Sequence, residues 1–330
     1  MIGVWLEDGR ISVRDDLPDP RPGPGEAVIR VLAAGICGTD LELGRGYRPF
    51  RGIPGHEFVG RVEDGPGDWP GSRVVGEINV TCRARGAPPC PACAAGRPSH
   101  CRDRTIVGIT GRDGAFAERL VLPAVNLHHV PDGVSDDAAA FAEPLAAAFR
   151  ILEQVDVRPD DRVLVLGPGR LGRLVARVLG GTGCELTVAG RSGAGLSRAA
   201  AAGVATCLAD ALGEREYDIA IDCTGAPAGF DLARGALRPG GRLVLKSTYA
   251  GELALDASRL VVDEITVIGS RCGPFPAALD ALSAGAVRVE DLIDDRFPLD
   301  AAPRAFERAA EPGVLKVLLT PRGSSSPAPA

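Results

Sequence analysis

The sequence predicts an α/β protein of two domains, a barrel-like β domain followed by an open parallel sheet with helices on both faces. Short β-type runs separated by Gly and Pro fill the first 145 residues or so. Strand-like and helix-like segments then alternate from 162 to 268, which is typical of βαβ units. Between the first such strand and helix stands a glycine-rich turn, at 167–172.

Length and composition fit this fold and exclude several functions. The chain has 330 residues, of which 45% are apolar and 24% charged, as in globular domains. A net charge of −6 provides no basic field for nucleic acid. No apolar run approaches the ~20 residues of a membrane helix, and the first residues lack a signal-peptide pattern. We therefore expect a cytoplasmic protein without nucleic-acid or membrane partners.

In the β domain, expected over 1–147, residues 27–32 and 57–62 predict strands. Residues 137–150 predict a helix that Pro144 interrupts.

The second domain is expected over 148–275, and it opens with a continuous apolar run of the buried parallel-strand type. The chain is then expected to return to the first domain over 276–322 and to end in a disordered Gly/Ser/Pro tail, 323–330. The segments that predict the sheet are a strand at 162–166, a helix at 171–179, and strands at 185–189, 219–222, 242–245 and 265–268.

The glycine-rich turn GPGRLG predicts a dinucleotide site, because it follows a buried strand and opens a helix. Gly167 permits the tight turn, Gly169 lets the backbone approach a pyrophosphate, and Gly172 allows close packing of helix on strand. Free N–H groups at the helix start, around Leu171, then face the phosphates. The alternative is a glycine turn that binds no ligand.

The end of the second strand favours NADP over NAD. An NAD site carries a carboxylate there for the ribose 2′-hydroxyl, whereas this chain has Arg191 and Ser192, which suit a 2′-phosphate. The alternative is an NAD enzyme in which Arg191 stacks on adenine. The ends of the later strands are expected near the nicotinamide or elsewhere on the coenzyme: Thr224, Gly225, Lys246, Ser247, Thr248 and Arg271.

Nine cysteines in a reducing compartment point to metal ligands rather than disulfides. Cys82, Cys90, Cys93 and Cys101 fall within one 20-residue stretch and form a candidate site. The scattered cysteines are expected to be buried small hydrophobes: Cys184, Cys207, Cys223 and Cys272.

Two further strings carry good zinc ligands, Cys37 in AGICGTD (34–40) and His56 in PGHE (54–57). Their 19-residue separation fits no zinc finger. Together with FAEPL (141–145), DCTG (222–225) and EITVIGS (264–270), they resemble the zinc-dependent medium-chain dehydrogenase/reductase family, the alcohol and polyol dehydrogenases. The resemblance covers about 1–320.

This resemblance implies a GroES-like β-barrel catalytic domain, an inserted Rossmann domain with a doubly wound sheet, and a cleft between them. It implies that Cys37 and His56 hold a catalytic zinc. Glu143 stands where alcohol dehydrogenases have a cysteine and polyol dehydrogenases a glutamate, so the chain is similar to the sorbitol and threonine dehydrogenase branch. Glu57 approaches the metal in some members. Which of the two glutamates binds zinc stays open.

The resemblance also assigns roles around the metal. Asp40 would hydrogen-bond His56 and fix its tautomer. Thr39 would take the proton of the substrate hydroxyl. Many relatives have a histidine at the position of Glu42, where it passes the proton to solvent; Glu42 relays the proton instead or binds ribose.

The family's structural zinc usually has the pattern C-x2-C-x2-C-x7-C. This chain keeps the last three cysteines, has Ala87 in place of the first, and carries Cys82 five residues earlier. Because a Cys₄ site needs no fixed loop length, we expect a second, structural zinc. The alternative is a cysteine lobe that has lost its metal.

The expected function is hydride transfer between a nicotinamide coenzyme and a secondary alcohol, with a polyol, cyclitol or sugar-like substrate favoured by Glu143. The alternatives are a biosynthetic aldehyde or ketone reductase, a zinc-free quinone or enoyl reductase, and a non-catalytic nucleotide-binding protein. Residues expected at the substrate wall are Tyr47, Phe50 and Phe116, with Arg48, Arg51 and Arg271 as anion ligands or merely solvated side chains.

An exposed sheet edge at 264–270 favours pairing of copies, as a homodimer or homotetramer.

Overall fold

The computed structural model describes residues 1–46, 48–249 and 252–321, and it divides into two compact units. Unit 1 comprises residues 1–143 and the described residues from 275 onward; unit 2 comprises residues 144–274. The predicted disordered tail, 323–330, and Tyr47 lie outside the described residues.

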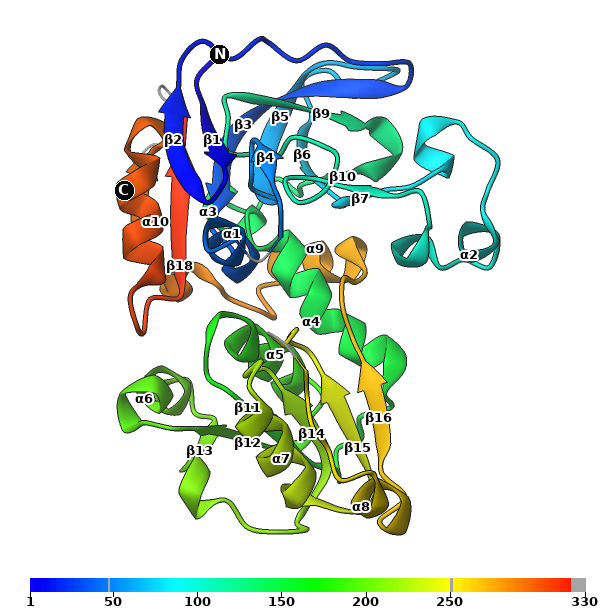
Figure 1. The fold of residues 1–330 in the computed structure, drawn as a ribbon, viewed down its shortest axis with the longest axis vertical. Coiled ribbons are helices and arrows are strands. Elements are labelled where there is room, and N and C mark those ends of the chain that lie inside the picture. The colour runs from blue at the N-terminus through cyan, green and yellow to red at the C-terminus, as the bar shows by residue number, and fades with distance from the viewer. Residues whose placement is uncertain (47, 250–251, 322–330) are drawn as a thin grey trace. The chain divides into compact units, whose positions relative to one another are not determined.

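Unit 1 is built on a sheet with the strand order β10-β6-β5-β3-β18-β17, in which β9 also pairs with β3 (Figure 1). The two sequence-predicted runs lie inside the long central strands β3 and β5. The strands are β3 (Glu26–Gly35), β5 (Glu57–Asp64), β6 (Arg73–Gly76), β9 (Arg119–Pro123), β10 (Leu127–His129), β17 (Ile293–Pro298) and β18 (Lys316–Thr320).

The register around β3 brings distant parts of the chain together. Gly35, the last residue of β3, is opposite Glu57 of β5 on one side and Leu318 of β18 on the other. A side chain at Gly35 would meet both neighbours, since an added Cβ would lie 2.7 Å from Glu57 Oε2 and 3.1 Å from Lys316 Cδ. The C-terminal strand therefore reaches the start of β5, next to His56.

Smaller elements complete unit 1. A sheet of order β2-β1-β4 and a pair β7-β8 flank the main sheet, and α10 packs on β18 (Figure 1). Their bounds are β1 (Gly3–Glu7), β2 (Arg10–Arg14), β4 (Arg51–Gly52), β7 (Asn79–Val80), β8 (Thr105–Ile106), α1 (Gly38–Gly44), α2 (Pro91–Ala94), α3 (Asp136–Ala139), α9 (Phe275–Ser283) and α10 (Ala302–Ala310).

The helical stretch expected over 137–150 is interrupted, but not at Pro144. It consists of α3 and α4 (Ala142–Gln154), with the break at residues 140–141. Pro144 stands in the first turn of α4, where a backbone N–H has no acceptor within the helix. Its missing N–H therefore costs nothing there, and the helix continues through it.

Unit 2 confirms the predicted open parallel sheet. Its strand order is β13-β12-β11-β14-β15-β16, and every neighbouring pair is parallel. The order reverses direction at β11, so the switch point lies between β11 and β14. The strands are β11 (Arg162–Leu166), β12 (Glu185–Gly190), β13 (Ala205–Leu208), β14 (Tyr217–Asp222), β15 (Leu237–Leu245) and β16 (Thr266–Gly269).

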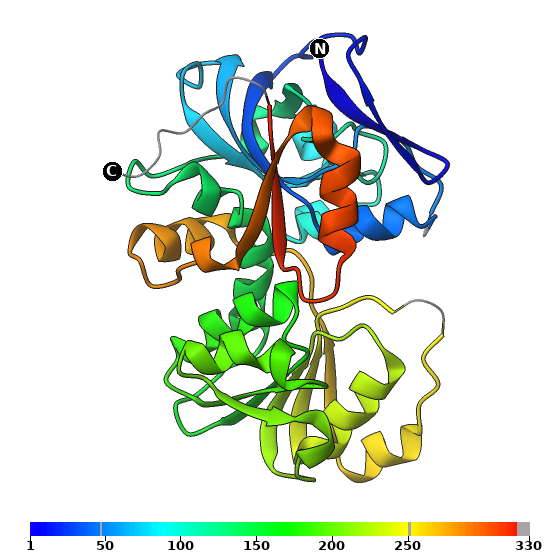
Figure 2. The ribbon, with the colours of Figure 1, turned by 90° about the vertical axis from the view of Figure 1, so that its left-hand side faces the viewer.

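Helices lie on both faces of this sheet (Figure 2). They are α5 (Arg170–Gly180), α6 (Gly193–Ala201), α7 (Pro227–Ala236) and α8 (Ala257–Val262), together with α4. Leu164, Phe230 and Leu243 are at most 1% exposed in the core between β11, β14, β15 and α7. This core holds the carboxyl ends of the strands in one row.

Candidate metal centre and coenzyme site

Cys37 occupies the N-cap of α1, and the start of that helix fixes its position. Its backbone N–H donates to Asp40 Oδ2 at 2.8 Å, one turn further on. Thr39 Oγ1 lies 3.8 Å from Cys37 Sγ. The helix start thus places a sulfur, a hydroxyl and a carboxylate together.

His56 comes directly before β5, and it faces that carboxylate. Its Nδ1 lies 3.4 Å from Asp40 Oδ1, and the two side chains are 3% and 0% exposed. Neither atom has a hydrogen-bond partner of good geometry among the described residues. Because Nδ1 faces Asp40, Nε2 is the ring nitrogen left for a metal.

The electrostatics of this pocket favour a positive charge. Burial lowers the pKa of His56, but Asp40 and Cys37 outweigh it and hold that pKa well above its ordinary value. The same negative field would hold a metal cation, which takes the place of the proton on the ring.

The ligand atoms of Cys37, His56 and Glu57 all lie within 4.8 Å of one another. Sulfur, imidazole nitrogen and carboxylate oxygen are the donors that zinc takes in proteins. The residues present therefore fit a zinc ion.

Glu57 already has a cationic partner that the sequence pattern did not indicate. Lys316 Nζ of β18 donates to Glu57 Oε2, and these side chains are 4% and 2% exposed. The same ammonium lies 5.2 Å from the centre of the Phe141 ring. A buried glutamate beside a metal site is thus compensated by one of only two lysines in the chain.

The other expected carboxylates lie apart from this group. Glu143 stands in the first turn of α4, is half-buried, and is not in the set of residues within 4.8 Å. Glu42 is exposed on α1 and pairs with Arg45 at 2.6 Å.

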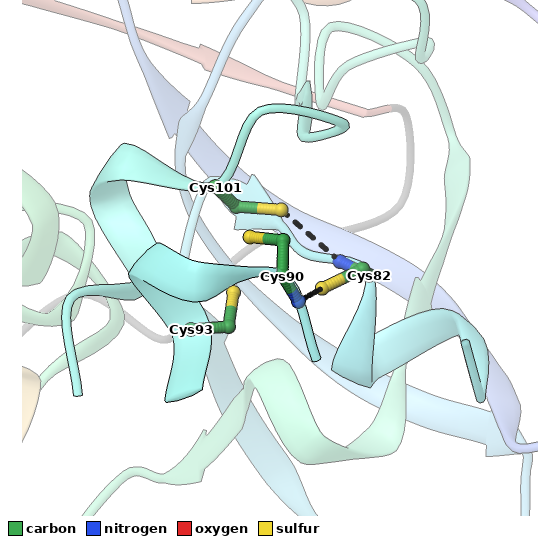
Figure 3. A group of neighbouring side chains, drawn as sticks. All are labelled: Cys82, Cys90, Cys93 and Cys101. Carbon is green, nitrogen blue, oxygen red and sulfur yellow. Dashed lines mark hydrogen bonds between the residues drawn. The ribbon is translucent and has the colours of Figure 1, made fainter. Parts of the chain in front are cut away.

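The clustered cysteines form a second group of metal-ligand type. Cys82, Cys90, Cys93 and Cys101 are all buried, and their sulfur atoms lie within 4.8 Å of one another, turned toward a shared space (Figure 3). The backbone N–H of Cys82 donates to Cys101 Sγ and that of Cys90 to Cys82 Sγ, each at 3.4 Å. Four sulfurs with N–H donors fit a tetrahedral zinc.

The thiols of this group differ in acidity. A hydrogen bond from the backbone of Cys93 is the largest of the effects that lower the pKa of Cys90 to about 6. Burial is the largest of those that raise the pKa of Cys93 to about 12.

The glycine-rich turn has the geometry of a phosphate cradle. Gly167 has φ +100°, and a Cβ at Gly172 would lie 2.0 Å from Gly167 O, so helix α5 packs directly on the turn. A Cβ at Gly169 would meet nothing within 4 Å. The turn therefore leaves open space above its backbone, at the start of α5 where Leu171 lies.

The residues at the end of β12 are arranged around the start of α6. Ser192 is the N-cap, and its Oγ accepts from Gly195 N at 3.3 Å. Arg191 is exposed. Arg173, which sequence reasoning missed, is 6% exposed and donates to Pro168 O at 2.8 Å and to Gly195 O at 2.5 Å. It ties the glycine-rich turn to the start of α6.

At the end of β14, Asp222 is fully buried and anchors the next turn. Its Oδ1 accepts from the backbone N–H of Thr224 at 2.8 Å and from Thr224 Oγ1 at 2.7 Å, while Oδ2 accepts from Tyr249. Gly225 follows with φ +65°. Ser247 is half-buried, whereas Thr248 and Arg271 are exposed.

The side chains expected at the substrate wall are spread widely. Phe116 is fully buried and packs edge-on against Phe306, with ring centres 5.8 Å apart. Arg51 pairs with Glu7 at 3.0 Å, and Arg48 is exposed. The scattered cysteines are half-buried rather than fully buried as expected: Cys184, Cys207, Cys223 and Cys272.

Among the described residues, no helix combines the length and the apolar character required to span a membrane.

Comparison with known proteins agrees with this geometry. The family described as alcohol dehydrogenase GroES-like domain matches residues 23–132, and the family described as zinc-binding dehydrogenase matches residues 171–284. The chain is 32% identical to L-threonine 3-dehydrogenase of Streptomyces avermitilis, with 96% of each chain covered. It is 28% identical to sorbitol dehydrogenase of Halalkalibacterium halodurans, covering 95% of this chain and 96% of the relative.

A solved structure is also similar over its full length. It belongs to a protein of Sinorhizobium meliloti described as a zinc-binding dehydrogenase and solved with NADP bound. The TM-score is 0.89 at 29% identity, covering 97% of this chain and 99% of that one.

Proposed function

The chain belongs to the zinc-binding alcohol dehydrogenase family, and from that premise we propose how its residues interconvert a secondary alcohol and its ketone with a nicotinamide coenzyme. The observation that carries the proposal is the meeting of Cys37, His56 and Glu57 within 4.8 Å, with Asp40 behind the histidine. A zinc ion held there would polarise the substrate oxygen, and the coenzyme would accept or donate the hydride.

Around this centre the protein's own side chains hold ligands and move a proton. Asp40 Oδ1, 3.4 Å from His56 Nδ1, attracts a proton on that nitrogen and so leaves Nε2 for the metal. Thr39, beside Cys37 Sγ, relays the proton of the substrate hydroxyl: in oxidation its own hydroxyl proton is passed on as it accepts that of the substrate, and in reduction the relay runs in reverse. Glu42, exposed on the same helix, hands that proton to solvent.

Glu57 and Glu143 are the two candidates for the remaining protein ligand. We propose that Glu57 uses one carboxylate oxygen for Lys316 and keeps the other for the metal. Formal charges then balance. Zinc would offset the thiolate of Cys37 and the carboxylate of Glu57. Lys316 offsets the carboxylate of Asp40 behind the histidine. Glu143, at the start of α4, lies outside the set of residues within 4.8 Å and stays the second candidate ligand.

The coenzyme is held by the glycine-rich turn, with NADP preferred. Gly167, Gly169 and Gly172 shape the turn for the pyrophosphate, and the exposed Arg191 guanidinium forms a bidentate pair with the 2′-phosphate. No carboxylate stands at this strand end to repel that phosphate. Ser192 caps α6 and adds a hydroxyl donor.

A second zinc is proposed in the cysteine lobe, where it would have a structural role. The support is the four buried sulfurs with their two N–H···S contacts. A closed Cys₄ site leaves no position for substrate and contributes to folding rather than to chemistry.

We propose a polyol, cyclitol or sugar-like secondary alcohol as substrate. The support is a carboxylate-rich metal centre, and the similarity to sorbitol and threonine dehydrogenases points the same way.

Two copies would pair through β16. This strand ends the sheet of unit 2, and Val267 on it is 41% exposed, with Val261 and Val262 of α8 at 74% and 80%. An unpaired apolar edge of this kind favours association.

Absorbance at 340 nm on protein of measured zinc content tests the function. A panel of polyols, cyclitols, amino alcohols and simple alcohols is run with NADP⁺ and NAD⁺ separately. We expect turnover of a polyol with NADP⁺ favoured. Turnover with NAD⁺ favoured would overturn the coenzyme preference alone, whereas no turnover by zinc-loaded protein that binds coenzyme would overturn the substrate class.

A further inference from the structure

Arg173 is a buried cation on helix α5, directly after the glycine-rich turn. Its side chain is 6% exposed, and the other buried residues of α5 are glycine or aliphatic: Gly172, Leu174, Val175, Ala176, Val178 and Leu179. Burying a guanidinium is unfavourable unless its N–H groups are hydrogen-bonded, a requirement that an aliphatic side chain at this position would not have. The bonds of this guanidinium, rather than its packing, therefore account for an arginine here.

Two of these bonds join segments that are separate in the sequence. Arg173 Nε donates to Pro168 O at 2.8 Å, within the glycine-rich turn. Nη2 donates to Gly195 O at 2.5 Å, in the first turn of α6. Because a guanidinium presents its N–H donors in one rigid plane, the two bonds set the spacing between these carbonyls.

Glycines let the same two segments pack closely. A Cβ at Gly190, the last residue of β12, would lie 2.8 Å from Pro168 Cγ and Cδ. A Cβ at Gly195 would lie 3.5 Å from Pro168 Cγ. The loop between these glycines is thus held at both ends, by the Pro168 ring at Gly190 and by Arg173 at Gly195.

This loop contains Arg191 and Ser192, the residues proposed above for the 2′-phosphate. NADP has to reach both segments at once, with its pyrophosphate at the glycine-rich turn and its 2′-phosphate at the loop. NAD lacks the second phosphate. The spacing between turn and loop therefore matters more for NADP than for NAD.

The glycine-rich turn also has supports of its own. Gly167 N donates to Ala189 O at 2.9 Å, and α5 packs on Gly167 O through Gly172. Without Arg173, the start of α6 would lose its tie to the turn, while the pyrophosphate cradle would keep these contacts.

We propose that Arg173 is a positioning residue for coenzyme selection: by bridging Pro168 and Gly195, it holds Arg191 at the distance from the glycine-rich turn that NADP requires. The proposal rests on the coenzyme site and the NADP preference proposed above. Arg173 acts through the loop and needs no contact with either phosphate. A loop already held in the binding geometry loses less conformational freedom when the coenzyme binds, which raises affinity.

The test is the ratio of the Kd of NAD⁺ to that of NADP⁺, measured by titration calorimetry on the purified full chain. For Arg173→Met we expect the ratio to fall about tenfold, because the Kd of NADP⁺ rises while that of NAD⁺ stays within about threefold. A merely structural role would weaken both coenzymes alike, or lower Tm and leave the ratio unchanged.

Two further variants of α5 separate the bridge from other effects. Arg177→Met, which removes an arginine one turn further along the helix, is the matched control and should keep the ratio of the unchanged chain. Arg173→Lys keeps the charge but presents one nitrogen in place of the two that make these bonds, so most of the selectivity should be lost there too. It carries the test if Arg173→Met does not fold.

A double-mutant cycle with Arg191 shows whether Arg173 acts through the loop. In a chain that already carries Arg191→Ala, adding Arg173→Met should change the Kd of NADP⁺ by less than about threefold, since the contact that Arg173 positions is gone. Equal effects of Arg173→Met with and without Arg191 would overturn the inference.

An unchanged ratio in a folded Arg173→Met chain, or full selectivity in Arg173→Lys, would also overturn the inference while the coenzyme site stands. The unchanged chain reports on the proposed function by itself. If it binds neither coenzyme, or binds NAD⁺ as tightly as NADP⁺, the proposed coenzyme site or its preference is wrong, and the inference falls with it.

Discussion

Lys316 and Glu57 form a buried ion pair between the last strand of unit 1 and the strand that follows His56. They are 259 residues apart in sequence, and both side chains are less than 5% exposed. The two residues meet because β3 pairs with β5 on one side and with β18 on the other. The metal centre therefore depends on the C-terminal strand β18 as well as on segments 34–40 and 54–57, which carry its ligands.

Removing the lysine should destabilise the chain, because Glu57 would be left buried without a partner. We expect Lys316→Met to lower the free energy of unfolding by about 3–5 kcal/mol in metal-free protein. Urea denaturation measures the loss. The double variant Lys316→Met with Glu57→Gln should recover most of it, and equal loss in the single and double variants would contradict an ion-pair explanation.

Asp40 should act through His56 rather than on substrate. Asp40→Asn keeps the shape of the side chain but weakens the contact with Nδ1, so we expect zinc affinity at this centre to fall about 10–100-fold. Competition with a chelator measures it. Glu42→Gln, on the exposed face of the same helix, should leave the affinity unchanged; an equal loss there would point to a general effect on α1.

Loss of a lobe cysteine should remove metal and stability together. Cys101→Ser is expected to lower the zinc content by one ion per chain and to lower Tm, since a structural zinc adds its binding energy to folding. Elemental analysis and thermal denaturation measure both. Cys184→Ser, outside the lobe, should change neither, and a Cys101→Ser chain with full zinc content would show that the lobe holds no ion.

Arg191 should determine the choice between coenzymes. Arg191→Ala loses the charge-assisted bonds to the 2′-phosphate, so the Kd of NADP⁺ should rise about tenfold or more while that of NAD⁺ changes little. Titration calorimetry with both coenzymes measures the difference. Arg238→Ala removes an arginine from the amino-terminal start of β15, in the same sheet, and should have no effect. Equal weakening of NADP⁺ and NAD⁺ by Arg191→Ala would favour adenine stacking instead.

Local sequence patterns predicted the sheet of unit 2 well. Residues 162–166 coincide with β11, because a parallel strand buried on both faces has a continuous apolar sequence. The same reasoning located β12, β14, β15 and β16 to within a few residues. It missed β13 and α6, whose residues are only partly buried and show no strong period.

Contacts between distant segments could not be predicted in this way. Neither Lys316 beside Glu57 nor Lys246 beside Ser270 has a local signature, because each pairing depends on the register of the sheet. Arg173 looked like an ordinary helix residue, yet its guanidinium braces the glycine-rich turn. Pro144 was expected to interrupt a helix. It does not, because α4 begins at Ala142 and Pro144 lies in its first turn.

Whether Cys37 holds a catalytic zinc is tested by the zinc content of Cys37→Ser and its rate of absorbance change at 340 nm, each compared with that of Cys184→Ser. We expect Cys37→Ser to lose one zinc per chain and at least about a thousandfold in kcat/KM, since the ion would supply several kcal/mol of transition-state stabilisation. Cys184→Ser should retain both. A folded Cys37→Ser chain that keeps its full zinc content and most of its activity would show that Cys37 holds no catalytic zinc.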